Sequence, residues 1–320
     1  MATAVVLPHV FDDLAPERAV LEPLGIAVID ATGLDAQATL NLAAGADALL
    51  VQTPVRADAA LIARLARCRV IGAYGVGYDH IDVAAAASRG IQVVHVPDYG
   101  TEEVAEHTLA IVLACLRGLP RLSAGVAAGR WDYMDAGPLH RISGRTLGIV
   151  GLGRIGGRVA DKARAFGFRL LACDPYVPAE AFAARGAEPR TLEALLAESD
   201  VVTLHTPLTP ETRGLMNARA FALMKRGSVL VNAARGAVVD EAALLAALDE
   251  GRIASAGIDV LPEEPPAPDH PLRRDRRVIL TPHAAWYSEE SKVALKRLLA
   301  EDIARVLAGE PARCPVTPTR

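Results

Sequence analysis

The sequence predicts an α/β protein made of two doubly wound parallel-sheet domains. Short, continuously apolar runs alternate along the chain with alanine-rich segments of helical periodicity, a pattern typical of parallel strands covered by helices on both faces. This alternating series starts near the N-terminus and starts again at Leu147. The length of 320 residues also exceeds the size at which a single hydrophobic core usually stops growing, so we expect two domains.

The first series of elements lies before residue 98 and is expected to form a flavodoxin-like domain. Its strands are predicted from apolar runs that are bounded by turn-forming residues, at Ala4–Leu7, Ile26–Ile29, Ala48–Val51, Val70–Ala73 and Gln92–Val96. Alanine-rich segments between the later runs predict helices at Ala57–Cys68 and Val83–Arg89.

The second series is expected to form a Rossmann domain. It begins with a strand at Leu147, and its further strands are predicted at Val201–Leu204, Ser228–Val231, Ser255–Ile258 and Val278–Leu280. Its helices are predicted at Arg154–Phe166, Leu192–Ala197, Asn217–Met224 and Glu241–Glu250.

Two longer helices set the expected domain boundaries. Apolar positions recur every four residues in Thr101–Gly118, where Thr101 can cap the N-terminus. Ser288–Leu307 is also amphipathic. If this last helix packs on the first series, residues 1–98 and 286–320 form one domain and residues 99–285 form the other. The crevice between two such domains is the expected ligand site.

The charge balance argues against nucleic acid or a membrane as a partner. Lys and Arg number 34 against 38 Asp and Glu, which gives a formal net charge of −4 and no basic surface of the kind that polyanions attract. The basic run at 273–277 is interpreted as a solvated loop. The most apolar long stretch, Val104–Leu116, is too short and too polar to span a bilayer.

The cysteines and the N-terminus favour a soluble, cytoplasmic protein. The four cysteines lie far apart, which predicts reduced thiols rather than a disulfide framework or a metal site, and they are Cys68, Cys115, Cys173 and Cys314. Those at 115 and 173 fall in apolar runs and are expected in the core. Met1–Asp13 lacks the pattern of a secretory signal.

A glycine-rich turn is the clearest sign of function. The apolar run from Leu147 leads directly into G-x-G-x-x-G at Gly151, Gly153 and Gly156. Such a strand, turn and helix binds the pyrophosphate of a dinucleotide at the helix N-terminus. The next apolar run ends in Asp174, close to where an acid binds the adenosine ribose, although a turn residue before Pro175 is the alternative. A carboxylate there favours NAD over NADP.

Three polar side chains follow predicted strands, where the ligands of open α/β sheets bind. They are Arg235, Glu264 and His283. Hydride transfer to or from an anionic substrate needs a cation, a proton donor and a group that orients that donor, and these residues supply one of each. Each residue taken singly also has a structural alternative. Arg235 could be a surface cation, Glu264 is one of two adjacent glutamates in a proline-rich loop, and His283 could cap the last helix.

The remaining histidines lack such company and are interpreted as structural or exposed. They are His9, His80, His95, His107, His140 and His270; His205 is treated separately below. Histidine, cysteine and carboxylate residues do not occur together at metal-ligand spacing, so no metal is predicted.

At this point the sequence resembles the D-isomer-specific 2-hydroxyacid dehydrogenases. The matching motifs are Gly75–Asp82, the Gly151 turn, Asn232–Gly236, Asp259–Pro265 and Thr281–His283. The resemblance runs from about residue 72 to the end of the last predicted helix and covers the first 70 or so residues weakly. It implies an NAD-dependent enzyme that interconverts 2-keto acids and D-2-hydroxy acids. Residues 1–98 and 286–320 would then form its substrate-binding domain and residues 99–285 its NAD-binding domain.

The resemblance implies a role for each of the three polar residues. Arg235 would bind the substrate carboxylate and polarise its carbonyl. His283 would donate a proton to the carbonyl oxygen on reduction and remove it on oxidation. Glu264 would hold the imidazole and favour its protonated form.

It also implies a set of binding residues. Backbone amides of Gly75, Val76 and Gly77 would bind the other end of the carboxylate, and Asp259 would hold the nicotinamide amide. The full set of implied cofactor contacts is Val76, Gly151, Gly153, Arg154, Ile155, Gly156, Asp174, His205, Thr206, Pro207, Thr212, Ala233, Ala234, Arg235, Asp259 and His283.

The segment Pro282–Glu289 is similar to the C-terminal binding proteins, which are NAD-dependent corepressors within this family. Trp286 would then present an apolar wall to the substrate side chain, whereas a core or interface aromatic is the alternative. The branch resemblance leaves a second function open, that of an NAD-sensing interaction protein. The family also implies a homodimer, with Thr101–Gly118 at the dimer face.

Departures from family patterns narrow the expected substrate. Phosphoglycerate dehydrogenases often have arginine where this chain has Ala73, phosphite dehydrogenases have lysine at the position of Val76, and formate dehydrogenases have glutamine at the position of Glu264. The resemblance therefore favours a small or apolar 2-keto acid such as glyoxylate or hydroxypyruvate, or a branched or thioether-bearing acid.

Overall fold

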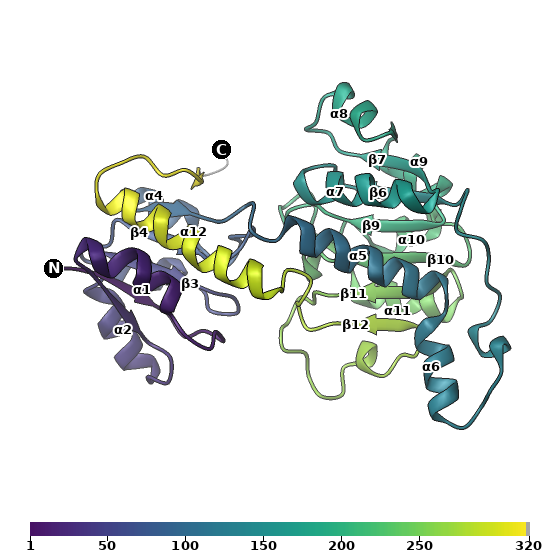
Figure 1. Ribbon diagram of the computed structural model, residues 1–320, viewed down its shortest axis with the longest axis horizontal. Helices are drawn as coiled ribbons and strands as arrows, with labels where there is room; N and C mark the ends of the chain where they lie inside the picture. The colour runs from purple at the N-terminus through teal and green to yellow at the C-terminus, as the bar shows by residue number, and fades with distance from the viewer. Residues whose placement is uncertain (318–320) are drawn as a thin grey trace. The chain divides into compact units, whose positions relative to one another are not determined.

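The computed structural model describes residues 1–317, which form two compact units. The first unit combines Met1–Gly100 with the chain from Ser288 on, and the second is Thr101–Tyr287. The last three residues of the predicted segment 286–320 lie outside the described residues. Each unit contains one sheet, parallel except for one edge strand of the first unit, with helices against it (Figure 1), so the predicted fold class is confirmed.

Among the described residues, the sheet of the first unit has six strands in the order β13-β5-β4-β3-β1-β2. Their bounds are β1 Ala2–Val6, β2 Ile26–Asp30, β3 Ala48–Val51, β4 Val70–Ala73, β5 Gln92–Val94 and β13 Pro315–Val316. The first five pair in parallel, whereas β13 runs antiparallel to β5. The sequence does not predict β13, because a strand of only two residues is too short to show a periodic pattern.

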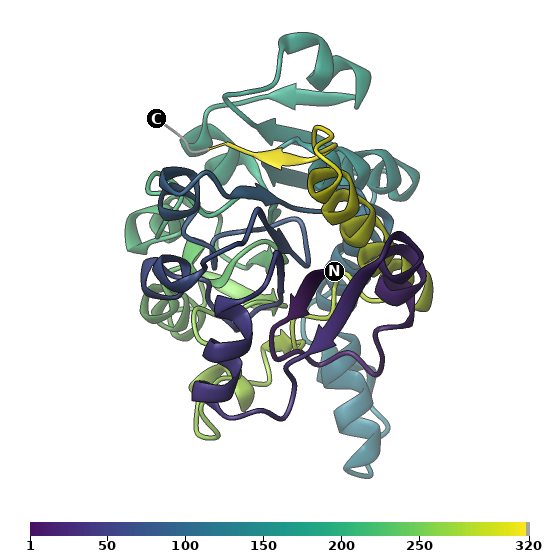
Figure 2. The same cartoon turned by 90° about the vertical axis from the view of Figure 1, so that its left-hand side faces the viewer.

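Helices of the first unit cover this sheet. They are α1 Ala15–Leu21, α2 Ala36–Ala44, α3 Ala59–Arg64, α4 Val83–Ser88 and α12 Glu289–Leu307. Ser288 caps α12 in a capping box with Ser291. Figure 2 shows α12 in yellow beside the purple α1. A Cβ at Gly72 on β4 would lie 2.8 Å from Cδ1 of Leu299, so glycine allows α12 to approach the sheet closely.

A buried charged cluster joins α1, α12 and the end of β4. Oη of Tyr74 donates to Oε1 of Glu17 at 2.6 Å, and Nζ of Lys296 lies 3.6 Å from Oε2 of Glu17. Glu17 is 0% exposed and Lys296 is 2% exposed. Burial raises the pKa of Glu17, although Tyr74 and Lys296 oppose that rise. The cluster fixes the strand end directly before Gly75.

In residues 101–287, the second unit has a seven-stranded parallel sheet in the order β12-β11-β10-β9-β6-β7-β8. Its strands are β6 Thr146–Val150, β7 Arg169–Cys173, β8 Ala187–Pro189, β9 Val201–Leu204, β10 Ser228–Asn232, β11 Ile253–Ile258 and β12 Val278–Leu280. The strand order reverses at β6, which pairs with both β7 and β9. The carboxyl end of β6 is therefore the switch point where a ligand is expected.

The helices of the second unit are α5 Thr101–Leu116, α6 Leu119–Ala127, α7 Arg154–Ala163, α8 Ala179–Ala184, α9 Leu192–Glu198, α10 Ala218–Leu223 and α11 Glu241–Asp249. Thr101 is the first residue of α5 rather than its cap. Most apolar residues of α5 are buried within its own unit, where the helix contacts α7, β10 and β11. Gly118, with φ +61°, separates α5 from α6.

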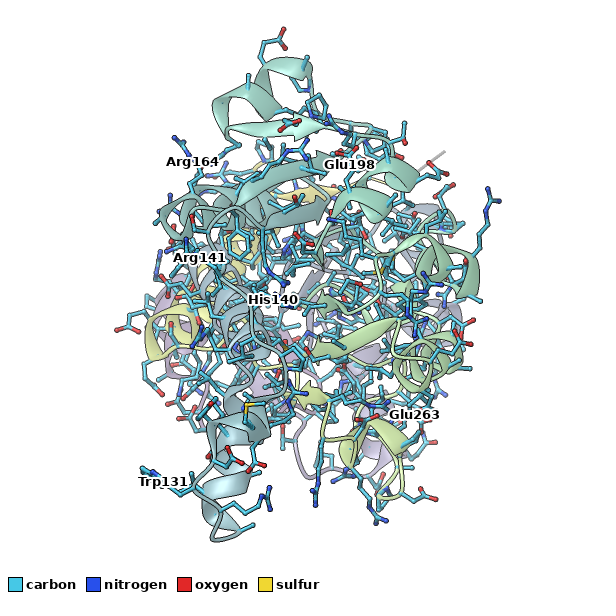
Figure 3. All side chains as sticks on the ribbon, turned by 90° about the vertical axis from the view of Figure 1, so that its right-hand side faces the viewer. Trp131, His140, Arg141, Arg164, Glu198 and Glu263 are labelled. Carbon is cyan, nitrogen blue, oxygen red and sulfur yellow. The ribbon has the colours of Figure 1, made fainter. Side chains whose placement is uncertain are left out.

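An exposed apolar segment follows α5, at α6 and the short helical turn η2, Tyr133–Ala136. Its exposed side chains are Leu119, Val126, Trp131, Tyr133 and Met134. Figure 3 shows Trp131 pointing away from the ribbon, and this side chain is 91% exposed. The apolar residues at the surface thus lie beyond the helix that the sequence places at a dimer face.

Two expectations about individual residues need correction. In the basic run at 273–277, Arg273, Arg274 and Arg276 are exposed as expected, but Arg277 is partly buried. Its guanidinium donates to the carbonyl of Leu248 at 2.7 Å and pairs with Asp249 and Asp275. Cys173 is only half-buried, in contrast to Cys115, which is 7% exposed. Leu248 and Asp249, which contact Arg277, are distant in sequence, so local composition does not reveal these contacts.

Within the described part of the chain, no single helix is long and apolar enough to cross a membrane. The pair α5 and α6 meets the length and composition criteria only when taken together, and it is bent by 64°.

Candidate active site

The glycine-rich turn connects β6 to α7 and depends on two close backbone approaches. Gly151 has φ +92°, and a Cβ there would lie 2.6 Å from the carbonyl oxygen of His205. A Cβ at Gly156 would lie 1.9 Å from the carbonyl oxygen of Gly151. These distances exclude any side chain at either position and explain why the turn requires glycine.

Gly153, the middle glycine of the turn, borders open space. Gly153 is the N-cap of α7, and a Cβ built there would meet no atom of residues 1–317 within 4 Å. The first N–H groups of a helix lack partners within the helix, and the helix dipole is positive at that end. Open space in front of such N–H groups suits a diphosphate.

Asp174 lies beside this turn, at the end of β7. Its Oδ2 accepts from the backbone N–H of Leu152 at 2.8 Å, and its Oδ1 accepts from the N–H of Tyr176 at 2.9 Å. Each carboxylate oxygen has a further lone pair. Asp174 thus braces the turn and retains acceptor capacity for ribose hydroxyls, so the turn-residue alternative and the binding role are compatible.

The end of β9 contributes polar atoms that lack partners. Nε2 of His205 lies 3.0 Å from Oγ1 of Thr203, whereas Nδ1 of His205 is buried with no hydrogen-bond partner among residues 1–317. The same holds for Oγ1 of Thr206. Burial lowers the pKa of His205 to about 3, so its ring is neutral near pH 7. Buried polar atoms normally have partners, and a bound ligand would supply them.

The neighbouring loop is closed by its own threonines. Oγ1 of Thr212 donates to the carbonyl oxygen of Pro207 at 2.6 Å, and the N–H of Thr209 donates to Oγ1 of Thr212 at 2.8 Å. Because a hydroxyl has one hydrogen, the side chain of Thr212 is occupied as a donor within the loop.

The imidazole of His283 contacts the carboxylate of Glu264 directly. Nδ1 of His283 lies 2.7 Å from Oε2 of Glu264, while Oε1 accepts from the N–H of Leu261 at 2.8 Å. Burial acts to raise the pKa of Glu264, but the hydrogen bond and charge of His283, the Leu261 amide and the charge of Arg235 together lower it. Glu264 is therefore ionised at neutral pH and accepts from Nδ1, which leaves Nε2 as the other ring nitrogen.

Arg235 follows β10 in a turn that packs against the loop of Glu264. A Cβ at Gly236 would lie 2.0 Å from the carbonyl carbon of Leu261, so the two backbones touch at this point. The side chain of Asn232 organises the turn, because its Nδ2 donates to the carbonyl of Arg235 and its Oδ1 accepts from the N–H of Ala234. The guanidinium donates to the carbonyl of Ala234 at 2.8 Å. The structure thus brings Arg235, Glu264 and His283 together.

Asp259 organises the segment that carries His283. Its carboxylate is 1% exposed and accepts from the hydroxyl of Thr281 at 2.6 Å and from the backbone N–H groups of Ala284 and Ala285 at 2.9 and 3.0 Å. His283 has φ +53°, a left-handed conformation that is rare outside glycine.

Sequence reasoning missed one residue of this site. It set His107 aside, but Nε2 of His107 lies 3.1 Å from Oγ1 of Thr281. The signal was present in α5, because position 107 shares a helical face with the buried residues Val104 and Ile111. A polar residue on such a face needs a polar partner.

The remaining predicted site residues lie on two other segments. In the first unit, Gly75 has φ +146°, and the carbonyl of Val76 lies 2.7 Å from Nδ1 of His95. In the second unit, the rings of Trp286 and Tyr287 meet edge to face at 5.8 Å. The structure does not test the predicted substrate contacts of Gly75, Val76, Gly77 and Trp286, and these stay predictions.

The residues of the second unit fit a dinucleotide. The turn from Gly151 offers unfilled space at a helix N-terminus, Asp174 offers acceptors for a ribose, and the unpartnered atoms of His205 and Thr206 lie after the adjacent strand. In the described part of the chain, no group of three or more His, Cys, Asp or Glu side chains could hold a metal ion.

This geometry defines the second unit as a dinucleotide-binding domain, and comparison with known proteins identifies its family. The family model described as D-isomer specific 2-hydroxyacid dehydrogenase, NAD binding domain, matches residues 109–285. The chain belongs to this family, and its cofactor is NAD. The comparisons do not show the branch that resembles the C-terminal binding proteins.

Relatives with different named substrates cover most of the chain. It is 41% identical over 294 residues to the D-3-phosphoglycerate dehydrogenase of Methanocaldococcus jannaschii, which covers 92% of this chain and 56% of that relative. It is 40% identical over 277 residues to the glyoxylate reductase of Aeropyrum pernix, at 85% and 83% coverage. The chain spans just over half the length of the phosphoglycerate dehydrogenases it matches.

Solved structures agree with the family assignment. The D-lactate dehydrogenase of Aquifex aeolicus, in complex with NAD and lactic acid, superposes with a TM-score of 0.86 at 30% identity over 96% of each chain.

Proposed function

We propose that the protein is an NAD-dependent oxidoreductase that interconverts a 2-keto acid and the corresponding D-2-hydroxy acid. The observation that carries this proposal is the 2.7 Å contact between Nδ1 of His283 and Oε2 of Glu264, beside Arg235 in the unit that contains the NAD-binding domain of the family.

His283 acts as the acid and base. Because Nδ1 faces Glu264, Nε2 is the ring atom that exchanges a proton with the substrate oxygen. Bound NADH supplies the hydride for the carbonyl carbon. Nε2 then gives its proton to the carbonyl oxygen, so that one hydride and one proton convert the ketone into the alcohol, and the reverse reaction returns both.

Arg235 binds the substrate. A guanidinium is always charged and matches a carboxylate with two parallel hydrogen bonds. The bond from the guanidinium to the carbonyl of Ala234 holds the side chain in a fixed direction, which reduces the entropy lost on binding. Backbone amides of Gly75, Val76 and Gly77 bind the same carboxylate in this proposal.

We propose that the substrate is a 2-keto acid with a small or apolar side chain. Ala73 supplies no charge for a phosphate group, and Trp286 supplies an apolar surface for the substrate side chain. Similarity to relatives named for 3-phosphoglycerate and for glyoxylate makes both compounds necessary members of a substrate panel.

A spectrophotometric assay tests the proposal. NADH oxidation is followed with glyoxylate, hydroxypyruvate, pyruvate, phenylpyruvate and 4-methylthio-2-oxobutyrate, and NAD reduction is followed with 3-phosphoglycerate. We expect turnover of at least one keto acid and little with 3-phosphoglycerate. Absence of turnover with every compound, in protein that binds NADH, would refute the enzymatic function and favour an NAD-sensing interaction protein.

We also propose a homodimer. The exposed apolar side chains from Leu119 to Met134 support it, because exposed apolar clusters mark interaction sites more often than chance. Light scattering at micromolar concentration tests this proposal, and a mass of one chain, 33.7 kDa, would contradict it.

A further inference from the structure

His107 on α5 contacts the segment that carries His283. Its Nε2 lies 3.1 Å from Oγ1 of Thr281 and 3.6 Å from Oδ1 of Asp259. The histidine side chain is 25% exposed and the Asp259 side chain is 1% exposed. The resemblance assigns His107 no role in the reaction.

The single hydrogen of the Thr281 hydroxyl decides which group donates in the contact with His107. Oγ1 of Thr281 donates to Oδ1 of Asp259 at 2.6 Å, and a hydroxyl has only one hydrogen to donate. Thr281 must therefore accept at its other contact, and Nε2 of His107 must carry a hydrogen. The result is a directed chain in which His107 donates to Thr281 and Thr281 donates to Asp259.

This chain ends on the carboxylate that holds both sides of His283. Asp259 accepts from the N–H groups of Ala284 and Ala285 through its side chain, and from the N–H of His283 at 2.8 Å through its carbonyl oxygen. His283 has φ +53°, and a left-handed conformation of this kind is unfavourable for a residue with a Cβ. The hydrogen bonds of Asp259 offset that cost and fix the direction of the imidazole.

We propose that His107 and Thr281 are positioning residues, which orient Asp259 and through it the strained turn of His283. Three hydrogen bonds from Thr281, Ala284 and Ala285 reach a carboxylate with roughly four lone-pair sites. The resemblance assigns the remaining site to the nicotinamide amide. The proposal rests on the proposed function for the role of His283, whereas the chain itself is measured without turnover.

Thr281→Val breaks the chain, and the structure offers a matched control. Thr108 is adjacent to His107 on α5, is 0% exposed, and has no hydrogen-bond partner for Oγ1 among residues 1–317. Thr108→Val therefore makes the same chemical change at a buried site without removing a hydrogen bond. Thr281→Ser retains the hydroxyl at the tested position.

Three measurements follow the consequences. Hydrogen exchange of the peptide that covers Thr281–Ala285, measured by mass spectrometry in the free protein, should become about ten-fold faster in Thr281→Val because a buried carboxylate loses a donor. The Kd for NADH should rise about five-fold and kcat should fall about ten-fold. Thr108→Val and Thr281→Ser should stay within about two-fold of the unsubstituted protein.

Variants of His107 test the first link. His107→Gln retains an N–H donor at a similar reach, whereas His107→Leu removes it, so only the leucine variant should accelerate exchange at Thr281–Ala285 and weaken NADH. Once Thr281→Val has cut the chain, adding His107→Leu should change these quantities by less than about two-fold, because interacting residues give non-additive effects.

Other outcomes would overturn the proposal. Multiplicative effects in the double variant, or equal exchange in Thr281→Val and Thr108→Val, would show that no chain links His107 to the turn. Uniformly faster exchange across the second unit would assign Thr281 to overall stability alone. If Thr281→Val does not fold, His107→Leu against His107→Gln decides. Missing turnover in the unsubstituted protein refutes the proposed function but leaves the exchange result valid.

Discussion

Nδ1 of His283 lies 2.7 Å from Oε2 of Glu264, while Oε1 of Glu264 accepts from the backbone N–H of Leu261. Both carboxylate oxygens are therefore engaged, and the imidazole is held with one nitrogen turned inward. This relationship supports the proposed proton transfer, because Nε2 is left to face the substrate. A carboxylate that orients a histidine is a recurring arrangement for acid and base catalysis.

Replacing Glu264 by glutamine should lower kcat about 10- to 100-fold. The amide retains the size of the side chain and an acceptor for Nδ1, but it removes the negative charge that favours the protonated imidazole. Steady-state kinetics check the change, with the Kd for NADH as the control. A kcat unchanged in Glu264→Gln would remove Glu264 from the mechanism.

The same residue predicts a pH effect on stability. The pKa of Glu264 is lowered in the folded protein from its usual 4.5, so its contribution is fully present above pH 4.5 and is lost as pH falls through the lower folded value. Denaturant unfolding should therefore show that Glu264→Gln loses less stability than the unsubstituted protein between pH 5 and about pH 3. Parallel curves for the two proteins would contradict this prediction.

His205 predicts a second effect of acid. Burial lowers its pKa from 6.5 to about 3, so the unfolded chain binds a proton that the folded chain excludes. The stability is fully present well above pH 6.5 and falls steadily as the pH drops toward 3, by about 1.4 kcal/mol at pH 5.5. His205→Asn should remove this part of the pH dependence in denaturant titrations, whereas an unchanged slope would show that His205 is protonated in the folded protein.

Substitutions at two glycines of the turn should affect NADH binding and protein stability differently. Gly153→Ala places a methyl group in open space and should weaken NADH at least ten-fold while leaving the melting temperature unchanged. Gly156→Ala drives a Cβ into the carbonyl of Gly151, at 1.9 Å, and should lower the melting temperature. Fluorescence titration and thermal unfolding distinguish the two, and full NADH affinity in Gly153→Ala would argue against a diphosphate at this helix end.

Arg235→Lys tests whether substrate binding requires a bidentate guanidinium or only a positive charge. A lysine retains the charge but loses the planar fork that matches a carboxylate, so kcat/KM for the keto acid should fall about 10- to 100-fold. Kinetics with saturating NADH measure this change. An Arg235→Lys variant with unchanged kcat/KM would leave the guanidinium without a role in substrate binding.

The sequence predicted the continuously apolar strands well. Val70–Ala73, Val201–Leu204 and Val278–Leu280 have the predicted bounds, because continuous apolar runs between turn residues define buried parallel strands. Short elements without such a pattern were missed, among them α1, α2, α6, α8 and β8. The helix predicted at Thr101–Gly118 had no predicted helix after it, whereas Pro120 suits the first turn of α6.

The candidate site was predictable where strand ends and motifs define it. Glu264 and His283 follow consecutive strands of one sheet edge, which places them together without further information. The partners of Asp259 were not predictable in the same way. His107 reaches Thr281 over a sequence separation of 174 residues, and only the packing of α5 against the sheet brings them into contact.

The proton transfer by His283 is the central claim, and His283→Ala tests it most directly. The variant retains the glycine turn and should bind NADH within about five-fold of the unsubstituted protein. With the best keto acid of the panel, kcat should fall about 10²- to 10⁴-fold, which is the usual contribution of a general acid. A His283→Ala variant that binds NADH and turns over within about three-fold of the unsubstituted protein would contradict the account.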